Sequence, residues 1–147
     1  MGDILSIRVL AQTMDEEDVA RTWPALCTLV WPRWMSMLKL QSMQLMHIIG
    51  PTLGPSSVER LFGQKQHGVL ELAQSLADIF RIGESPSCVL PAVKEPLAKM
   101  EVIFKQLNKA LADWKTQEAN LLTNELENAL NAMEQAILLV AQQIKAS

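Results

Sequence analysis

The stretch that decides the fold is residues 90–114, which read LPAVKEPLAKMEVIFKQLNKALADW. Apolar side chains recur in it at alternating steps of three and four residues, the spacing of a helix with one apolar face. The positions of this seam are Leu90, Val93, Leu97, Met100, Phe104, Leu107, Leu111 and Trp114. The pattern predicts a long helix whose seam packs against another helix.

Beyond Trp114 the seam changes register by one residue. A second apolar series takes over at Ala119, Leu122, Leu126, Ala129, Met133, Ala136 and Val140. All 6 Gly and all 7 Pro of the chain lie at or before Pro96, so neither residue marks a break here. Two structures fit the register change: a continuous coiled-coil rod about 90 Å long that stops supercoiling, or two separate helices.

The charges of the two halves favour two helices. Residues 94–115 contain five Lys and three acidic residues, whereas residues 118–134 contain four Glu and no basic residue. Each half has acid early and base late, which suits the dipole of a separate helix, and the halves would attract each other as an antiparallel pair. We therefore predict a helical hairpin over residues 86–147, with its turn within residues 115–124. The capping residues available for that turn are Thr116, Asn120, Thr123 and Asn124.

Residues 1–83 predict shorter apolar helices rich in Trp and Met. One helix begins at a capping box near Thr13 and runs toward Val30, with a kink or restart at Trp23-Pro24. The next starts with Trp31-Pro32 and continues to Ile48 or Ile49. A short helix capped by Ser56 or Ser57 and running to Phe62 follows, and an amphipathic helix begins near Val69 and ends before Gly83.

The sequence pattern leaves the structure of the N-terminal segment undecided. Residues 4–11 alternate as a strand would but also fit helical spacing, so a single N-terminal β-strand and a helix both stay open. Pro96 is expected in the first turn of the hairpin's first helix.

The predicted fold is all-α: one domain over residues 1–147, a bundle of four or five helices with a long C-terminal hairpin or rod.

Composition excludes several classes of protein. The formal net charge is −3 and the 13 basic residues never form a run, which argues against a nucleic-acid groove. The longest apolar stretches, residues 25–31 and 136–141, are far short of the roughly 20 residues that span a membrane. Cys27 and Cys88 are most simply two free thiols, which predicts a reducing, cytoplasmic location.

The sequence offers no assembled catalytic constellation. His67 lies in a polar, Gly-flanked stretch that predicts a solvated loop, and Glu16 and Glu17 suit a helix start better than acid–base chemistry. Phosphate-binding Gly loops and Cys-x-x-Cys or His-Glu-x-x-His motifs are missing from the chain. We therefore predict a protein that is not an enzyme and has no cofactor.

Residues 31–47 contain the one chemically suggestive cluster. Met43, Met46 and His47 can share one helix face, and soft thioether ligands with an imidazole suit Cu(I) or haem. Met is also a common filler of irregular cores, and core packing is the interpretation we prefer. A ligand- or metal-binding regulatory bundle that uses this segment is the alternative function.

The apolar helix faces predict association with other protein chains. Trp residues at helix starts and a long heptad seam are typical of core packing and also of subunit interfaces. The interface candidates are Trp23, Trp31, Trp34, Leu97, Phe104, Leu111 and Trp114. The predicted function is non-catalytic protein–protein interaction or assembly, as a structural, adaptor or chaperone-like protein that forms homo-oligomers, with a dimer favoured.

Overall fold

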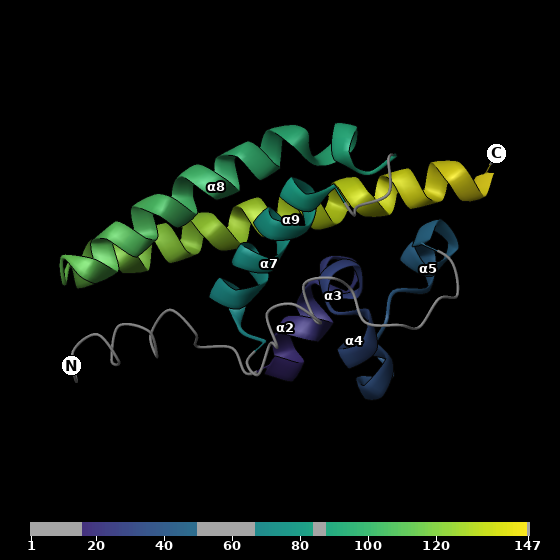
Figure 1. The fold of residues 1–147 in the computed structure, drawn as a ribbon, viewed down its shortest axis with the longest axis horizontal. Helices are drawn as coiled ribbons and strands as arrows, with labels where there is room; N and C mark the ends of the chain where they lie inside the picture. The colour runs from purple at the N-terminus through teal and green to yellow at the C-terminus, as the bar shows by residue number, and fades with distance from the viewer. Residues whose placement is uncertain (1–15, 50–66, 84–87, 147) are drawn as a thin grey trace.

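The computed structural model describes residues 16–49, 67–83 and 88–146. Of these residues 87% are helical and none is in a strand, which confirms the all-α prediction; the possible strand at 4–11 lies outside the described residues. The described part has seven helices (Figure 1). They are α2 (Glu16–Thr22), α3 (Pro24–Val30), α4 (Pro32–Leu38), α5 (Met43–Ile49), α7 (Val69–Ile82), α8 (Leu90–Ala112) and α9 (Thr116–Ala146).

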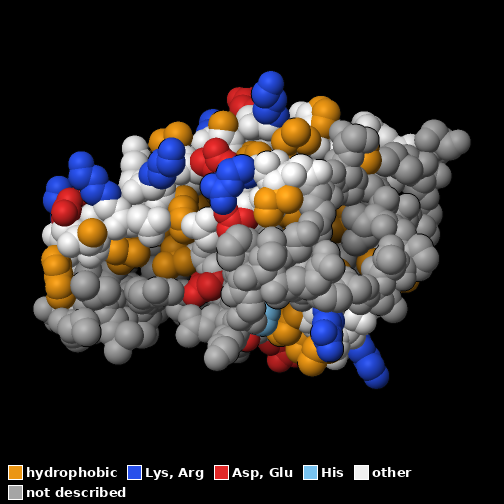
Figure 2. All heavy atoms as spheres, in the orientation of Figure 1, with side chains coloured by type: hydrophobic (Ala, Val, Ile, Leu, Met, Phe, Trp, Pro, Cys, Tyr) orange, Lys and Arg blue, Asp and Glu red, His pale blue; other side chains and the backbone are white. Residues whose placement is uncertain are grey.

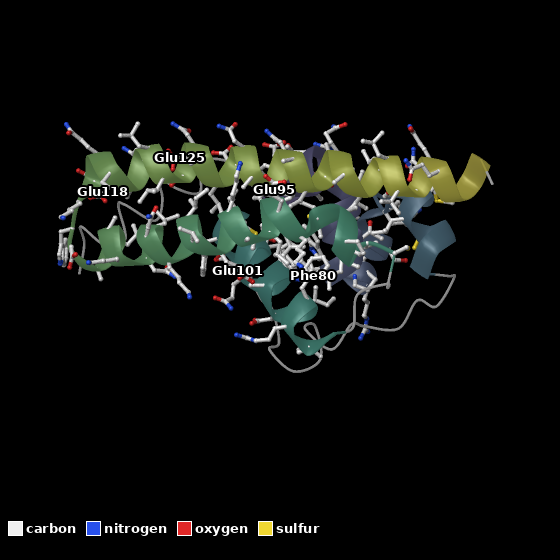
Figure 3. All side chains as sticks on the ribbon, turned by 90° about the horizontal axis from the view of Figure 1, so that it is seen from above. Phe80, Glu95, Glu101, Glu118 and Glu125 are labelled. Carbon is white, nitrogen blue, oxygen red and sulfur yellow. The ribbon has the colours of Figure 1, made fainter. Side chains whose placement is uncertain are left out.

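The two long helices α8 and α9 form the antiparallel hairpin, so the alternative of a continuous rod is wrong. Seen from above, they lie side by side (Figure 3), and their contact is the most extensive between any two helices in the described part of the chain. The first seam faces into this packing: Val93, Met100 and Leu107 are fully buried. The second seam is buried or half-buried along its length. The two predicted seams therefore lie on the two helices of one hairpin and pack within it.

The hairpin turn is built differently from the Thr/Asn turn that we expected. Trp114 adopts the left-handed conformation, with φ 62°. The Lys115 N–H then donates to the Ala110 carbonyl at 2.9 Å and the Trp114 N–H to the Leu111 carbonyl at 3.3 Å, the pair of bonds that closes a Schellman motif. Thr116 is already the first residue of α9.

The predicted charge attraction between the two helices is not realised as ion pairs. Among the described residues, none of the Lys residues of α8 forms an ion pair with a Glu of α9; Lys115, in the turn, lies 3.8 Å from Glu118. The hairpin is held by apolar side chains. Its charges remain on exposed surface, where ion pairs contribute little.

The N-terminal segments are divided more finely than predicted. The restart at Trp23-Pro24 is confirmed, because α3 begins at Pro24. A single helix from Pro32 to Ile49 is wrong: Lys39 takes φ 58° and closes a second Schellman motif, with the Leu40 N–H on the Met35 carbonyl at 3.1 Å. The hydroxyl of Ser42 then caps α5, accepting the Leu45 N–H at 3.3 Å.

Proline and glycine mark the remaining helix ends. Helix α7 ends at Ile82, before Gly83 as predicted, and Gly83 has φ 84° and donates its N–H to the Ile79 carbonyl. Pro96 is not in the first turn of α8, because the helix begins at Leu90 and Pro91 fills that turn. Pro96 therefore lies inside α8, where its missing N–H leaves the Ala92 carbonyl without a partner in the helix ladder.

One continuous apolar core includes side chains from all seven helices. Helix α3 lies at its centre, in contact with α2, α4, α5, α7 and α9. In Figure 1 the hairpin lies above and the short helices lie below it, with α7 packed against α8. The inner sides of α8 and α9 are thus covered, and their upper sides are left open by the other described helices.

The left-handed residue at the end of α4 gives a stability prediction. Left-handed backbone costs an L-residue about 1–2 kcal/mol and glycine almost nothing. We expect Lys39→Gly to be more stable than Lys39→Ala by about 1 kcal/mol in urea unfolding, because only the Ala variant keeps a Cβ. Equal stability of the two variants would contradict the left-handed assignment.

Candidate functional site

A buried carboxylate from α9 caps the N-terminus of α3. Glu134 is 4% exposed. Its Oε2 accepts the N–H of Ala25 at 3.1 Å and its Oε1 accepts the N–H of Leu26 at 3.0 Å. Pro24, the first residue of α3, has no N–H to satisfy. The negative charge therefore lies at the positive end of the helix dipole, more than a hundred residues away in sequence.

A second bond from α9 fixes the residue before that helix. The indole Nε1–H of Trp23 donates to Oδ1 of Asn131 at 2.8 Å, and Asn131 lies one turn before Glu134. Trp23 itself is 1% exposed. This predicted interface residue is therefore used inside the chain, as an anchor between α9 and the α2–α3 break.

The same carboxylate affects two pKa values. Burial raises the pKa of Glu134, and the hydrogen bonds from Leu26 and Ala25 oppose that rise. Burial, and then the nearby charge of Glu134, raise the pKa of the Cys27 thiol well above its usual value. Cys27 is held as a neutral thiol, which is not a nucleophile.

His67 is not in a solvated loop, as its polar neighbours in sequence suggested. It is 7% exposed and stacks on Trp34, with ring centroids 3.9 Å apart and an interplanar angle of 2°. Trp31 meets both rings edge-on, at 4.7 Å from His67 and 5.6 Å from Trp34. The carboxylate of Glu16 lies 3.5 Å from His67 Nδ1. The prediction was wrong because the polar neighbours gave no sign of the aromatic surface that the folded chain supplies.

The methionines of residues 31–47 do not converge on one place. Met35 is fully buried in the core, whereas Met37 and Met43 are 73% and 66% exposed. Met46 is half-buried on α5, and the side chain of His47 lies outside what the structure describes. Among the described residues, no group of three or more His, Cys, Asp and Glu side chains could hold a metal ion.

The other predicted interface residues divide into buried and partly exposed ones. Trp31 is fully buried, and Leu97 and Leu111 are each 8% exposed. Trp34 and Phe104 are half-buried against the core. Trp114, at the hairpin tip, is 44% exposed and is the most accessible of the seven candidates.

The face of the hairpin directed away from the core, which we call the outer face, carries large apolar side chains. Val102 of α8 is 56% exposed, and Leu121 and Leu139 of α9 are 67% and 58% exposed. Sequence reasoning missed these residues because it followed the two seams. The available signal was the spacing of the two leucines, which are 18 residues apart, or five full helical turns.

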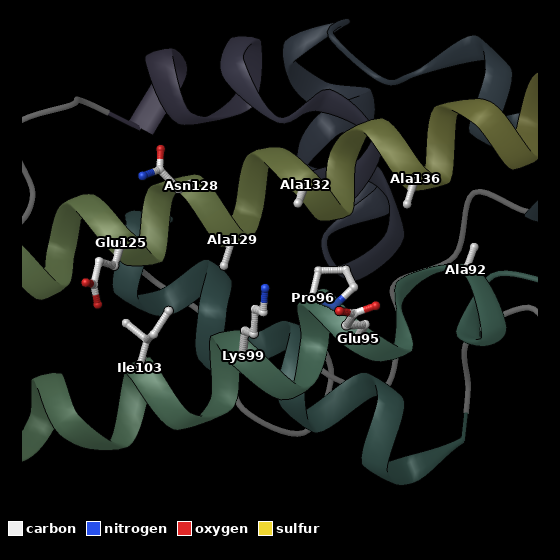
Figure 4. A pocket seen from close by; sticks show the side chains of 10 residues that line it. All are labelled: Ala92, Glu95, Pro96, Lys99, Ile103, Glu125, Asn128, Ala129, Ala132 and Ala136. Carbon is white, nitrogen blue, oxygen red and sulfur yellow. The ribbon is translucent and has the colours of Figure 1, made fainter.

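A groove of about 550 Å³ runs between α8 and α9 on this face (Figure 4). Its floor is made by small side chains and a proline, and its rims carry Glu95, Lys99 and Glu125. The lining residues are Ala92, Glu95, Pro96, Lys99, Ile103, Glu125, Asn128, Ala129, Ala132 and Ala136. Apolar and charged side chains alternate over the upper side of the molecule (Figure 2).

Two further cavities lie away from the outer face. One of about 480 Å³ lies between α7 and α8, lined by residues that include Gln74, Arg81 and Phe104. Gln74 and Arg81 both bond the buried carboxylate of Asp78, so their polar groups serve the fold. The other, of about 670 Å³, is lined by Pro24, by residues 40–44, which include Met43, and by Leu138.

Comparisons with known proteins add no assignment. No protein-family model matches the chain, no curated protein matches it, and no solved structure matches its fold. Within the described ranges, none of the helices is both long enough and apolar enough to cross a membrane.

Removal of the Glu134 cap is expected to be strongly destabilising. Glu134→Ala leaves two buried N–H groups without an acceptor and should cost about 3 kcal/mol of unfolding free energy. The matched control is Gln142→Ala, an exposed position on the same helix, which should change stability by less than about 0.5 kcal/mol. Equal effects of the two substitutions in urea unfolding would contradict the cap.

The raised pKa of Glu134 gives a pH dependence of defined sign. Above the ordinary value of 4.5 the unfolded chain releases this proton while the folded chain keeps it. Stability from this group is therefore lost as the pH rises from 4.5 through the raised folded pKa, and is constant above it. We expect the wild type to lose stability relative to Glu134→Gln over that window. A difference that stays constant with pH would contradict the assignment.

Proposed function

We propose that the protein is a non-catalytic assembly protein that binds other protein chains, including copies of itself, through the outer face of the α8–α9 hairpin. The exposure of Leu121 and Leu139 on one face of α9 carries the proposal. Single exposed apolar residues are common on protein surfaces. Here two leucines share a face, Val102 is exposed on the neighbouring helix, and the groove between them has small residues on its floor.

Burial of the exposed side chains on this surface would release enough free energy to stabilise association. Burying one leucine side chain contributes about 1.5–3 kcal/mol. The small side chains of Ala129, Ala132 and Ala136 allow another helix to approach closely, so that its side chains can enter the groove. Among the described side chains, no Lys or Glu of α8 forms an ion pair with α9, and these exposed charges can set the orientation of an incoming chain.

The side chains with reactive groups support a non-catalytic role, because each of them is engaged in packing or hydrogen bonding within the fold. The Cys27 thiol is buried with a raised pKa, the imidazole of His67 is stacked on Trp34, and the carboxylate of Glu134 is bonded to backbone N–H groups. Each contributes to folding. A ligand- or metal-binding role for residues 31–47 stays a prediction without a converging site to support it.

A reducing, cytoplasmic location is part of the proposal. Both cysteines are free, and Cys27 is buried in the core. A free thiol in the core is typical of proteins that fold in a reducing compartment.

Association measured by sedimentation equilibrium over a concentration series tests this proposal. We expect the wild type to self-associate and Leu121→Ser/Leu139→Ser to raise the dissociation constant about 100-fold or more, since two leucines contribute at least about 3 kcal/mol. The matched control is Met37→Ser/Met43→Ser, which removes two equally exposed side chains from α4 and α5.

Two results would contradict the proposal. One is a wild-type protein that stays monomeric into the high micromolar range. The other is a methionine variant that dissociates as readily as the leucine variant, because the association would then use a different surface.

A further inference from the structure

We infer that His67 is a pH-sensitive link, which holds α2, α4 and the start of α7 together more tightly when its imidazole is protonated. The link joins the His67 ring to the carboxylate of Glu16 and to the indole of Trp34. The inference goes beyond the proposed function and does not depend on it, since none of these residues belongs to the outer face of the hairpin.

His67 lies where three helices meet that are far apart in the sequence. It directly precedes Gly68, the N-cap of α7. Glu16 is the first residue of α2, and Trp34 lies in α4. In Figure 1 the lower end of α7 lies beside α2, and the 3.5 Å contact between Glu16 and His67 spans this junction. One imidazole ring therefore connects three short segments of the fold.

The geometry around His67 suits a charged ring. Oε2 of Glu16 lies 3.5 Å from Nδ1 of His67, and an opposite charge at that distance favours the protonated form. The indole of Trp34 lies parallel to the imidazole with the ring centroids 3.9 Å apart, so its face can attract a cation. Burial of His67 opposes protonation. The Glu16 side chain is 49% exposed, so the cost of burial falls on the imidazole alone and two attractive contacts act against it.

The charged residues of the surrounding helices differ in how they relate to this link. Helix α3, which ends beside Trp31, has no charged residue. On α2, Glu17 pairs with Arg21 at 2.8 Å, whereas the carboxylate of Glu16 meets His67. The other charged residues close in sequence to the link are Arg33, which precedes Trp34, and Glu71, four residues after His67. These charges stay the same when Glu16 is changed, so a Glu16 variant isolates one contact.

The direction of the pH dependence follows from the charged form of the ring. The link is strongest below the ordinary pKa of histidine, about 6.5, and weakens as the pH rises and the ring loses its proton. Stability from His67 is therefore present in mild acid and lost toward pH 8. The raised pKa of Glu134 acts in the same direction. The test therefore compares variants that all retain Glu134.

Proton NMR of the full chain tests the link through the ring signal of His67 between pH 5 and 8.5. The chain has 2 His, and the signal of His67 is identified by its loss in His67→Phe. We expect Glu16→Gln to lower the midpoint of the His67 titration by about 0.5 pH unit or more, because the neutral amide no longer attracts the charged ring. The matched control is Glu17→Gln, which removes the same charge from the adjacent position of α2 and should lower the midpoint by less than about 0.2 pH unit.

Urea unfolding provides a second readout, which reports the tighter packing itself. His67→Phe retains an aromatic ring that can stack on Trp34 but cannot take up a proton. We expect the unfolding equilibrium constant of His67→Phe, relative to that of the wild type, to be about threefold or more larger at pH 5.5 than at pH 8.

Each outcome decides the inference. A lowered midpoint in Glu16→Gln, together with a loss of stability in His67→Phe that is confined to low pH, supports the link. A midpoint that Glu16→Gln lowers no more than Glu17→Gln does would overturn it, and so would a stability difference between His67→Phe and the wild type that is independent of pH. Neither negative result affects the proposed function, because Leu121 and Leu139 are unchanged in all of these variants.

Discussion

The fold depends on one long-range interaction, the capping of α3 by the carboxylate of Glu134. Four short helices of seven residues each have little stability of their own, because helix formation at that length is unfavourable in water. The Glu134 carboxylate satisfies two N–H groups at the start of α3, and the Asn131 amide one turn away bonds Trp23. Together they fasten the centre of the short-helix group to the long helix α9.

This attachment decides which surfaces remain for binding. Helix α9 packs one side against α8 and another against α3 and α5. Asn131 and Glu134, which bond Trp23 and the start of α3, lie on the second of these sides. Most residues of the two heptad seams are buried in the hairpin and core, and Leu90 and Trp114, at the ends of the first seam, are partly exposed. What is left is the side opposite the core, where Leu121 and Leu139 are exposed beside the groove. The surface that we assign to association is therefore the part of the hairpin that is not packed against other helices of the chain.

The sequence predicts the hairpin well because heptad spacing and helix dipoles are local signals. It misses the break at Lys39 and places the hairpin turn within residues 115–124, slightly too late, since Lys39 and Trp114 adopt left-handed backbone where the expected signal is glycine. The environment of His67 and the role of Glu134 depend on partners that are distant in sequence, and no local pattern reports them. The exposed leucines of α9 could have been found from their five-turn spacing, but only the packing shows which side of the helix faces out.

The central claim is that the Glu134 carboxylate fastens α3 to α9 by accepting the N–H groups of Ala25 and Leu26. Amide hydrogen exchange at these two residues tests it most directly, measured in the wild type and in Glu134→Ala under conditions where both remain folded. We predict that exchange at Ala25 and Leu26 is slow in the wild type and about tenfold or more faster in Glu134→Ala, because a hydrogen-bonded amide exchanges only when the bond opens. Equal exchange rates in the two proteins would contradict the claim.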